Sequence, residues 1–554
     1  MERAGSSLPE VLCAVGGMAH TRAGGNVAGE GKLSGEGAPL SGRRLGAAAL
    51  LLAASVVASR LLGFVREMVL AARVGVGAGT DAYYAAFQIP DLLNYLLAGG
   101  ALAIAFTPLY LRTLRGEGER AAEELFRTVL GTLGALACVL TAALWVYADR
   151  LVDLQFGGFD AATRAQTVRL TRIVLPAQVF FIAGGIVRAV LMAHGRFGAQ
   201  AAAPILYNGA IIAGGLLTGS VEGFAWGALV GAVLGNWAVP VYDARKLGGV
   251  GFRVAPWDPR FHVYLWGALP LMLGLSLTTV DEWYERIFGA GLGVGVVAAL
   301  AFARRLMMAP VAVIGQAVAT AALPSLAALH ADGRSRELDV QLLSTLRITL
   351  LLAVWASAAF YVLADPIVEV VYQRGAFGPS DSARVGALLS LMGLAIPGWV
   401  TQQIAVRGFF ARGEMWRPMG LATLIALLAV PLYMALAERF GAEGLVVAGG
   451  LAISLNALLT LVWARLRFGG PDLAPLASTG LRALGAGGIA GLAAAGVLGW
   501  FSGGGLPGLL VAGATFGGVV VAAGWGLGDD VTRDALRGAA TRLRSGLRRL
   551  GGRP

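Results

Sequence analysis

The stretch SRLLGFVREMVLAARVGVGAGTDAYYAAFQIPDLLNYLLAGGALAIAFTP, residues 59–108, decides the fold. Its first half lies in an apolar run that begins near Leu45 and is long enough to cross a bilayer. Arg60, Arg66 and Glu67 nevertheless lie well inside that run. A charge at such depth costs about 2.5–3.5 kcal/mol on insertion scales. These three side chains are therefore expected to face something other than lipid.

Helix geometry predicts how these charges are arranged. At about 100° per residue, Arg60 and Glu67 share one face, and Arg66 lies roughly 120° round from Arg60. One interpretation is structural: Arg60 and Glu67 neutralise each other across two turns and hold neighbouring helices together. The other is functional, because two arginines against one carboxylate leave a buried positive surplus that favours an anion. We favour the functional interpretation.

The composition predicts an all-α polytopic membrane protein. Of 554 residues, 57% are hydrophobic and only 14% are charged, and the mean hydropathy is +0.70. Soluble proteins carry about 25% charged residues. The net charge of +11 does not indicate a nucleic-acid partner, because a basic excess in membrane proteins usually lies in cytoplasmic loops. We expect no enzymatic activity, no metal and no cofactor, because phosphate-binding, metal-ligating and nucleophile–base motifs are not found.

About fourteen apolar runs reach the roughly 20 residues needed to span a hydrocarbon core. Approximately, they cover residues 45–73, 81–111, 124–148, 167–193, 198–219, 223–244, 262–289, 293–328, 343–371, 382–410, 418–437, 443–464, 478–501 and 505–527.

The loops between these runs alternate in charge. Every second loop carries basic residues, namely Arg112, Arg115 and Arg120; His194 and Arg196; Arg245, Lys246, Arg253 and Arg260; Arg334 and Arg336; Arg412 and Arg417; Arg465 and Arg467. The intervening loops are nearly uncharged or mixed in sign. Because basic loops stay in the cytoplasm, the alternation predicts that both termini are cytoplasmic.

Both ends of the chain lie outside these spans. Residues 1–44 are rich in glycine, serine and alanine without sustained periodicity, which predicts a disordered tail. Residues 529–554 carry seven arginines and fit either a solvated tail that fixes topology or an amphipathic surface helix attracted to anionic lipid. Of the two interpretations of this basic tail, we favour the topological one.

An internal repeat divides the first twelve spans into two halves of the same orientation. GGALAIAFTPLYLRTL resembles GQAVATAALPSLAALH, with Pro108 matching Pro324, and LMAHGRF around Gly195 resembles FFARGEM around Gly413. The two offsets, 216 and 218 residues, nearly agree, which argues against chance similarity of Ala/Gly-rich helices. Duplicated halves of this kind are common in transporters, where the substrate site lies at the repeat interface.

The second half contains its own membrane-embedded charges. In TTVDEWYERIF, Asp281 and Glu285 share a face, and Glu282 can pair with Arg286 one turn later. An equally weighted interpretation places these residues at the outer membrane interface, where their charged ends reach water. In AFARRLMMAP, residues 301–310, one arginine of the pair is expected to face a cavity and the other the interface.

Several motifs, in order and spacing, resemble the MurJ (MviN) family of lipid II flippases in the MOP exporter superfamily. They are SRLLGFVRE, TDAYYAAFQIPDLL, AFTPLY, LMAHGRF, ARRLMMAP, ATAALPSL, YQRGAF and FFARGEMWRP. The resemblance covers roughly residues 45–530 and implies fourteen helices in a bacterial inner-membrane transporter. It implies an N-lobe at 45–247, a C-lobe at 248–467, and a lipid-tail groove formed by two helices at 468–528.

The resemblance also implies roles for individual residues. Substrate-binding residues would be Arg60 and Arg66, the acidic partner Glu67, Asp81 at the start of the second helix, and Arg305. Residues implied in ion binding or gating are Glu285, Arg286 and Asp281.

This sequence departs from the family pattern at two places. In the second span, Asn94, Tyr95 and Gly99–Gly100 stand where the family commonly has a basic pair followed by Glu-Gly. In the eleventh span, LATLIALLAVPLYMAL lacks the Asn or Asp that serves as a sodium ligand in some members. We therefore expect the membrane potential, rather than sodium, to drive transport.

The leading functional hypothesis is a flippase that carries lipid II to the outer leaflet during peptidoglycan synthesis. Cavity arginines would hold the pyrophosphate, because the planar guanidinium binds phosphate oxygens in a bidentate manner. Its expected partners are this glycolipid and membrane lipids. The alternatives are an exporter of another polyprenyl-pyrophosphate glycan or a small molecule, and a membrane scaffold without transport.

Overall fold

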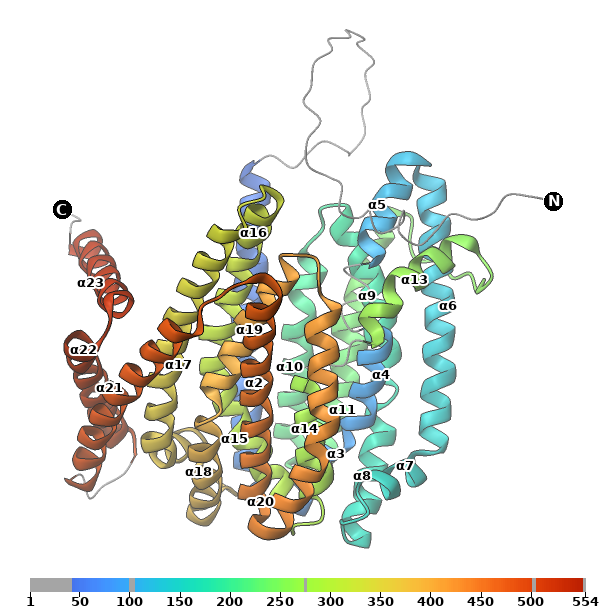
Figure 1. Ribbon diagram of the computed structural model, residues 1–554. Helices are drawn as coiled ribbons and strands as arrows, with labels where there is room; N and C mark the ends of the chain where they lie inside the picture. The colour runs from blue at the N-terminus through green and yellow to red at the C-terminus, as the bar shows by residue number, and fades with distance from the viewer. Residues whose placement is uncertain (1–41, 99–104, 274–276, 501–504, 552–554) are drawn as a thin grey trace.

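The computed structural model describes residues 42–98, 105–273, 277–500 and 505–551. The predictions for residues 1–41 and for Gly99–Gly100 lie outside this described part. The described residues form helices joined by short turns, and the long helices run side by side in one body (Figure 1).

The first half of the chain contributes the helices up to residue 247, including one π-helix, η2, and one 3-10 turn, η3. They are α2 (Gly42–Val74), α3 (Ala78–Ala86), α4 (Gln88–Ala98), α5 (Thr107–Gly116), α6 (Glu119–Val146), α7 (Ala148–Gln155), α8 (Ala161–Val174), α9 (Ala177–Ala193), α10 (Gly198–Thr218), α11 (Val221–Gly231), η2 (Ala232–Ala238), α12 (Val239–Ala244) and η3 (Arg245–Leu247).

The remaining chain contributes a second set of helices, again with a π-helix, η4. They are α13 (Pro259–Leu273), α14 (Leu277–Gly289), α15 (Val296–Pro310), η4 (Val311–Gln316), α16 (Ala317–Ala331), α17 (Ser335–Tyr372), α18 (Pro379–Gly393), α19 (Ile396–Phe410), α20 (Trp416–Phe468), α21 (Leu473–Trp500), α22 (Leu506–Leu527) and α23 (Asp530–Gly551).

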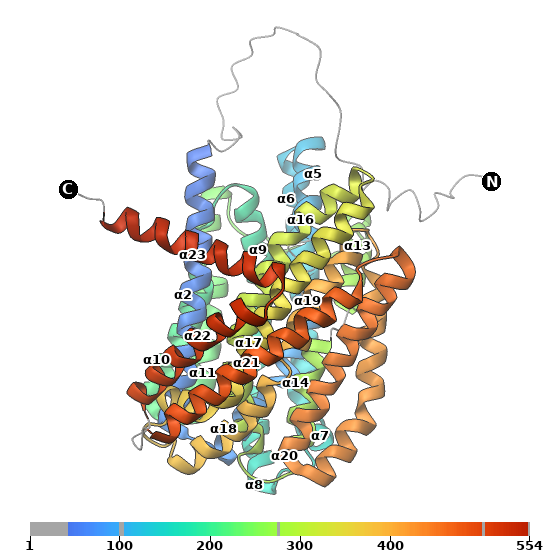
Figure 2. The same ribbon diagram turned by 60° about the vertical axis from the view of Figure 1, so that its left-hand side comes forward.

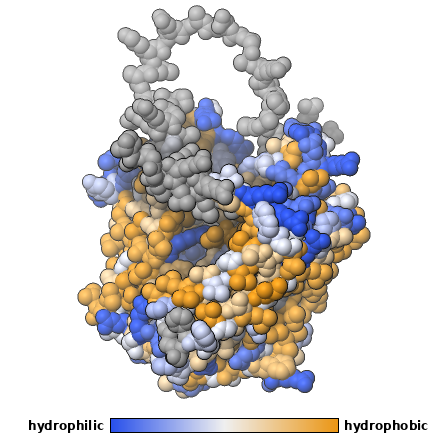
Figure 3. Space-filling view, turned by 90° about the vertical axis from the view of Figure 1, so that its left-hand side faces the viewer, coloured by the Kyte–Doolittle hydropathy of each residue, from blue (hydrophilic) through white to orange (hydrophobic). Residues whose placement is uncertain are grey.

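Each of the fourteen predicted spans falls on helical segments, which confirms the all-α polytopic fold class. Within the described part, nine helices are long and apolar enough to cross a membrane, or ten if the bent pair α18–α19 counts as one span. The 53-residue α20 holds two predicted spans, divided at Gly441, where the backbone leaves helical geometry. Hydrophobic side chains cover the middle of the face shown in Figure 3, as a bilayer requires.

The internal repeat is visible in matching turns. Gly195 and Gly413 both adopt a left-handed conformation, with φ of 73° and 75°. The residue after each glycine donates its N–H to the carbonyl five positions earlier, at 2.9 Å and 3.0 Å. Both turns are therefore the same glycine-dependent helix C-cap, in which the left-handed residue has no Cβ to clash.

The two halves make a backbone contact at one end of the molecule. There the N–H of Ala376 donates to the carbonyl of Ala72 at 2.9 Å. The glycines Gly75 and Gly375 allow this approach, because a Cβ would lie 2.6 Å from the Ala376 oxygen in one case and 2.2 Å from the Ala72 oxygen in the other. This end is opposite to the one that carries the α5–α6 turn and α16 (Figure 1).

The seventh span connects the halves. Its first helix, α13, packs on α4 and α6 of the first half, whereas α14 packs on α20 of the second. The pair α21 and α22 packs outside both, on α17 (Figure 2). Their shared apolar cluster includes Trp355, Leu363 and Phe516.

Candidate substrate cavity

A cavity of about 870 Å³ lies between the two halves. Helices α2, α3, α4 and α10 of the first half and α14, α15 and α19 of the second provide its walls. Its basic lining residues are Arg66, Arg286, Arg304, Arg305 and Arg407, and its acidic ones are Asp91, Glu282 and Glu285. A polar cavity of this size at the repeat interface is where transporters of duplicated architecture bind their substrates.

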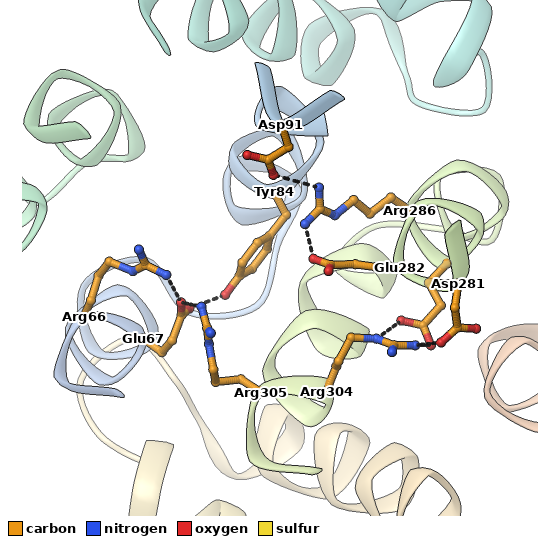
Figure 4. Close-up of polar contacts among 10 residues, drawn as sticks. Arg66, Glu67, Tyr84, Asp91, Asp281, Glu282, Arg286, Arg304 and Arg305 are labelled. Atoms are coloured by element: carbon orange, nitrogen blue, oxygen red, sulfur yellow. Dashed lines mark hydrogen bonds and ion pairs between the residues drawn. The ribbon is translucent and has the colours of Figure 1, made fainter. Parts of the chain in front are cut away.

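Glu67 is the centre of the first charge cluster. Its carboxylate accepts from Arg66 at 2.7 Å, from Arg305 at 2.9 Å and from the Tyr84 hydroxyl at 2.6 Å (Figure 4). Glu67 is only 1% exposed, and Arg66 reaches further to the Asn208 side-chain oxygen at 3.3 Å. Two guanidiniums on one carboxylate leave this wall of the cavity with a positive surplus.

Arg304 is the centre of the second charge cluster, in which two carboxylates pair with this one guanidinium. It donates to Asp281 at 2.6 Å and to Glu285 at 2.7 Å, and the Tyr433 hydroxyl also donates to Asp281. The two carboxylates are each 3% exposed. The interpretation that placed them at the outer membrane interface is therefore wrong: they point inward from α14 toward a guanidinium on α15.

Arg286 forms the third cluster. It pairs with Glu282 on its own helix, as the sequence predicted, and approaches Asp91 of α4 at 3.9 Å. These two carboxylates are about half exposed, at 45% and 49% of their side-chain surface. Sequence reasoning missed Asp91 because it lies in the first turn of α4, where an acidic residue is common and gives no sign of a binding site.

Arg407 of α19 is the cavity arginine whose positive charge is least compensated by carboxylates. Its guanidinium lies 5.4 Å from the centre of the Phe410 ring, and its Nε is buried without a hydrogen-bond partner. Within the described residues, it makes no ion pair with a carboxylate. Sequence reasoning missed it, although an arginine preceded by Gln402 and Gln403 inside an apolar run was a usable signal.

The other predicted site residues lie at the edge of this cavity or outside it. Arg60 is exposed and donates to the Gln316 side chain at 3.2 Å, whereas Glu67 pairs with Arg66 and Arg305, so the alternative interpretation of an Arg60–Glu67 pair is wrong. Asp81 is 1% exposed and accepts from the N–H of Ala298 at 2.7 Å and from that of Gly295. A carboxylate is favourable at this helix start.

The adjacent arginines Arg304 and Arg305 both line the cavity. The expectation that one would face the membrane interface was wrong. Both can reach the cavity because their partners lie on different sides: Arg305 turns to Glu67 of the first half, and Arg304 turns to Asp281 and Glu285 within the second.

Summed over the three clusters and Arg407, five arginines face five carboxylates, so the cavity is polarised rather than uniformly cationic. The positive side is formed by α2, α15 and α19, and the acidic side by α14 and α4. In the described part of the chain, no group of three His, Cys, Asp or Glu residues is arranged to hold a metal ion. Because most of its arginines gather on one side, the cavity can bind an anion at the wall formed by α2, α15 and α19.

A sequence model described as Lipid II flippase MurJ matches residues 70–515. The chain belongs to the MurJ family. It is 31% identical over 424 residues to a probable lipid II flippase MurJ of Rhizobium meliloti, covering 74% of this chain and 79% of that protein. It is 28% identical over 421 residues to the lipid II flippase MurJ of Burkholderia cenocepacia, covering 74% and 81%.

Solved structures show the same fold. A lipid II flippase MurJ in an inward closed conformation superposes with a TM-score of 0.73 at 19% identity, covering 86% of this chain and 98% of that one. An inward-facing multidrug resistance MATE transporter of the MOP superfamily superposes with a TM-score of 0.62 at 15% identity, covering 74% and 94%. With its long apolar helices, this MurJ-family chain is a multi-pass protein of the bacterial inner membrane.

Proposed function

We propose that this protein moves lipid II from the cytoplasmic to the outer leaflet of the inner membrane. The observation that carries the proposal is that Arg66 and Arg305, two cavity-lining arginines from opposite halves, pair with one buried carboxylate, that of Glu67. The substrate has a pyrophosphate and a sugar–peptide head that cannot enter hydrocarbon without large loss of hydration. Guanidiniums with uncommitted N–H groups would replace that hydration with charge-assisted hydrogen bonds.

Alternating access follows from where the binding groups lie. An anion that contacts both Arg66 and Arg305 bridges the two halves, so rocking of one half against the other would change its exposure. MATE transporters with this fold have been solved in inward-facing and outward-facing conformations. In this scheme, residues 45–247 and 248–467 act as the moving lobes, and the pair within 468–528 provides the groove for the lipid tail.

The orientation is also part of the proposal. The chain's arginine-rich turns, including the α5–α6 turn and the end of α16, lie at the same end of the molecule as α23 (Figure 1). Basic segments remain in the cytoplasm. We infer that this end and both termini are cytoplasmic, so the backbone contact between Ala72 and Ala376 closes the outer end.

The proposal is tested by rescue of cells depleted of their own lipid II flippase, with flipping of lipid II measured in proteoliposomes. Growth rescue together with flipping would support it. Flipping of a polyprenyl-pyrophosphate carrying another glycan, but not of lipid II, would instead indicate the alternative exporter function. Correctly inserted protein with no transport of either lipid would contradict both.

Arg66→Lys is expected to lower flipping about tenfold although the charge is retained, since one charge-assisted hydrogen bond is worth about 1.5–3 kcal/mol. Arg66 binds Glu67 and Asn208 through two nitrogens, and an ammonium cannot hold both while also binding phosphate. Initial flipping rates in proteoliposomes provide the measurement. Arg120→Lys is the control, since that loop side chain is 95% exposed. Equal rates for Arg66→Lys and wild type would mean that only cavity potential matters.

Transport is expected to depend on membrane potential and to be nearly indifferent to sodium. An inside-negative potential assists outward movement of an anionic head by about 2.3 kcal/mol per charge at 100 mV, roughly a fiftyfold bias. The Arg304 guanidinium already lies between Asp281 and Glu285, where a sodium ion would need those oxygens. Flipping at clamped potential is therefore expected to be equal in sodium and potassium buffers. Strong sodium dependence that disappears in Glu285→Gln would contradict this expectation.

A further inference from the structure

The C-terminal helix α23 is fixed to the membrane domain by its first residues. Asp529, just before α23, accepts from Arg347 of α17 at 2.6 Å and from the Thr479 hydroxyl of α21 at 2.5 Å. It also accepts from the Thr532 N–H at 2.9 Å, as a helix N-cap does. Burial raises the pKa of Asp529, but these hydrogen bonds outweigh burial and hold that pKa well below its usual range. The start of α23 is thus held at a defined depth.

The first two turns of α23 pack at the end of α22. Arg533 donates to the Trp525 carbonyl at 3.3 Å, and the Arg537 guanidinium lies 5.6 Å from the centre of the Trp525 ring. Leu536 packs against the apolar cluster of α17, α21 and α22. Tryptophan and arginine together are typical anchors at the level of lipid headgroups. Beyond these turns, α23 stands apart from the helical body in Figure 1, and in Figure 2 its far end projects beyond α2.

The sequence of α23 is amphipathic along its whole length. Helix geometry places Leu536, Leu543, Leu547 and Leu550 within an arc of about 60°. These positions define a leucine stripe in the sequence, and the same geometry assigns Arg544 and Arg548 to helix positions on one side of it and Arg542 and Arg549 to positions on the other.

We propose that α23 lies on the cytoplasmic membrane surface and binds anionic phospholipid headgroups through its arginines. Residues 529–554 contain seven arginines and three aspartates, so their charge complements an anionic leaflet. A freely solvated tail would leave the leucine stripe in water, whereas a helix lying in the interface buries it. The contacts at the start of α23 lead us to favour a surface helix over the solvated, topology-fixing tail that we preferred from the sequence. The proposal is independent of lipid II flipping.

Hydrogen exchange of the full-length protein in nanodiscs tests this assignment. Amides of residues 536–551 are expected to exchange about tenfold more slowly in discs with about one third phosphatidylglycerol than in pure phosphatidylcholine discs. High salt should remove most of this difference, because it screens the attraction.

Two sets of variants make the test specific. Replacing Arg542, Arg544, Arg548 and Arg549 by glutamine is expected to abolish the lipid dependence while leaving the leucine stripe intact. Replacing Arg112, Arg115 and Arg120 by glutamine removes charge from the α5–α6 region and should leave it unchanged. Equal exchange of wild type in both lipids would overturn the proposal, whether exchange is fast, as in a solvated tail, or slow, as in a helix held by protein contacts. Lipid dependence that persists without the four arginines would also overturn it.

Discussion

Arg305→Ala and Arg66→Ala are each expected to reduce lipid II flipping by at least about tenfold and up to roughly a hundredfold, because each removes charge-assisted hydrogen bonds worth about 1.5–3 kcal/mol. Each change also leaves Glu67, which is 1% exposed, with a single guanidinium partner. The positive surplus of this cavity wall then disappears. Initial flipping rates in proteoliposomes and rescue of depleted cells at matched membrane abundance measure the effect.

Arg60→Ala is the matched control for these variants. Arg60 is on the same helix as Arg66 but is exposed, and it donates a hydrogen bond to the uncharged Gln316 side chain. Its replacement is expected to cost much less transport than that of Arg66 or Arg305. Near-normal flipping by both Arg66→Ala and Arg305→Ala would show that the substrate phosphates bind elsewhere, with Arg407 the next residue to test.

Arg304→Met is expected to destabilise the protein by about 3–5 kcal/mol, the usual cost of leaving a buried ion pair without one partner. Here the cost falls on two carboxylates, because Asp281 and Glu285 both lose the same guanidinium. Methionine retains much of the side-chain volume, so the effect should report lost charge pairing rather than a cavity. The measurement is thermal unfolding of the purified protein in detergent.

Two comparisons identify the cause of that destabilisation. Arg286→Met removes an arginine with the same 9% side-chain exposure, but its partners Glu282 and Asp91 are about half exposed and can be hydrated, so its effect should be smaller. Combining Arg304→Met with Asp281→Asn and Glu285→Gln should restore most of the stability. A triple variant no more stable than Arg304→Met would show that packing, not charge pairing, dominates at this site.

Much of the fold was predictable from the sequence because its signals are local. Each apolar run must satisfy its own backbone within a helix, so length and composition are enough to place the spans. The repeat was predictable from Gly195 and Gly413, since a left-handed helix end strongly favours glycine. The packing of α13 on the first half and of α14 on the second depends on tertiary contacts that a hydropathy pattern does not contain.

The candidate site was predictable in its residue types but not in its pairing. Depth in the membrane predicted that Arg60, Arg66 and Glu67 face something other than lipid, because the cost of burying charge in lipid is large, and Arg305 was implied by the family resemblance. Which charge meets which depends on how α2, α14 and α15 approach one another. The sequence therefore did not predict that Glu67 pairs with Arg66 and Arg305, underestimated the acidic side of the cavity and missed Arg407.

The backbone contact between Ala72 and Ala376 has a consequence for the speed of the transport cycle. Opening that end exchanges a main-chain hydrogen bond for hydrogen bonds to water, a net change of only about 0.5–1.5 kcal/mol. The Asp81 carboxylate, when released from the start of α15, would also gain hydration. Because breaking such contacts costs little free energy, they add little to the activation barrier for opening this end of the molecule. We therefore expect turnover to be limited by rearrangement of the buried ion pairs at the centre, where separating charges costs several kcal/mol.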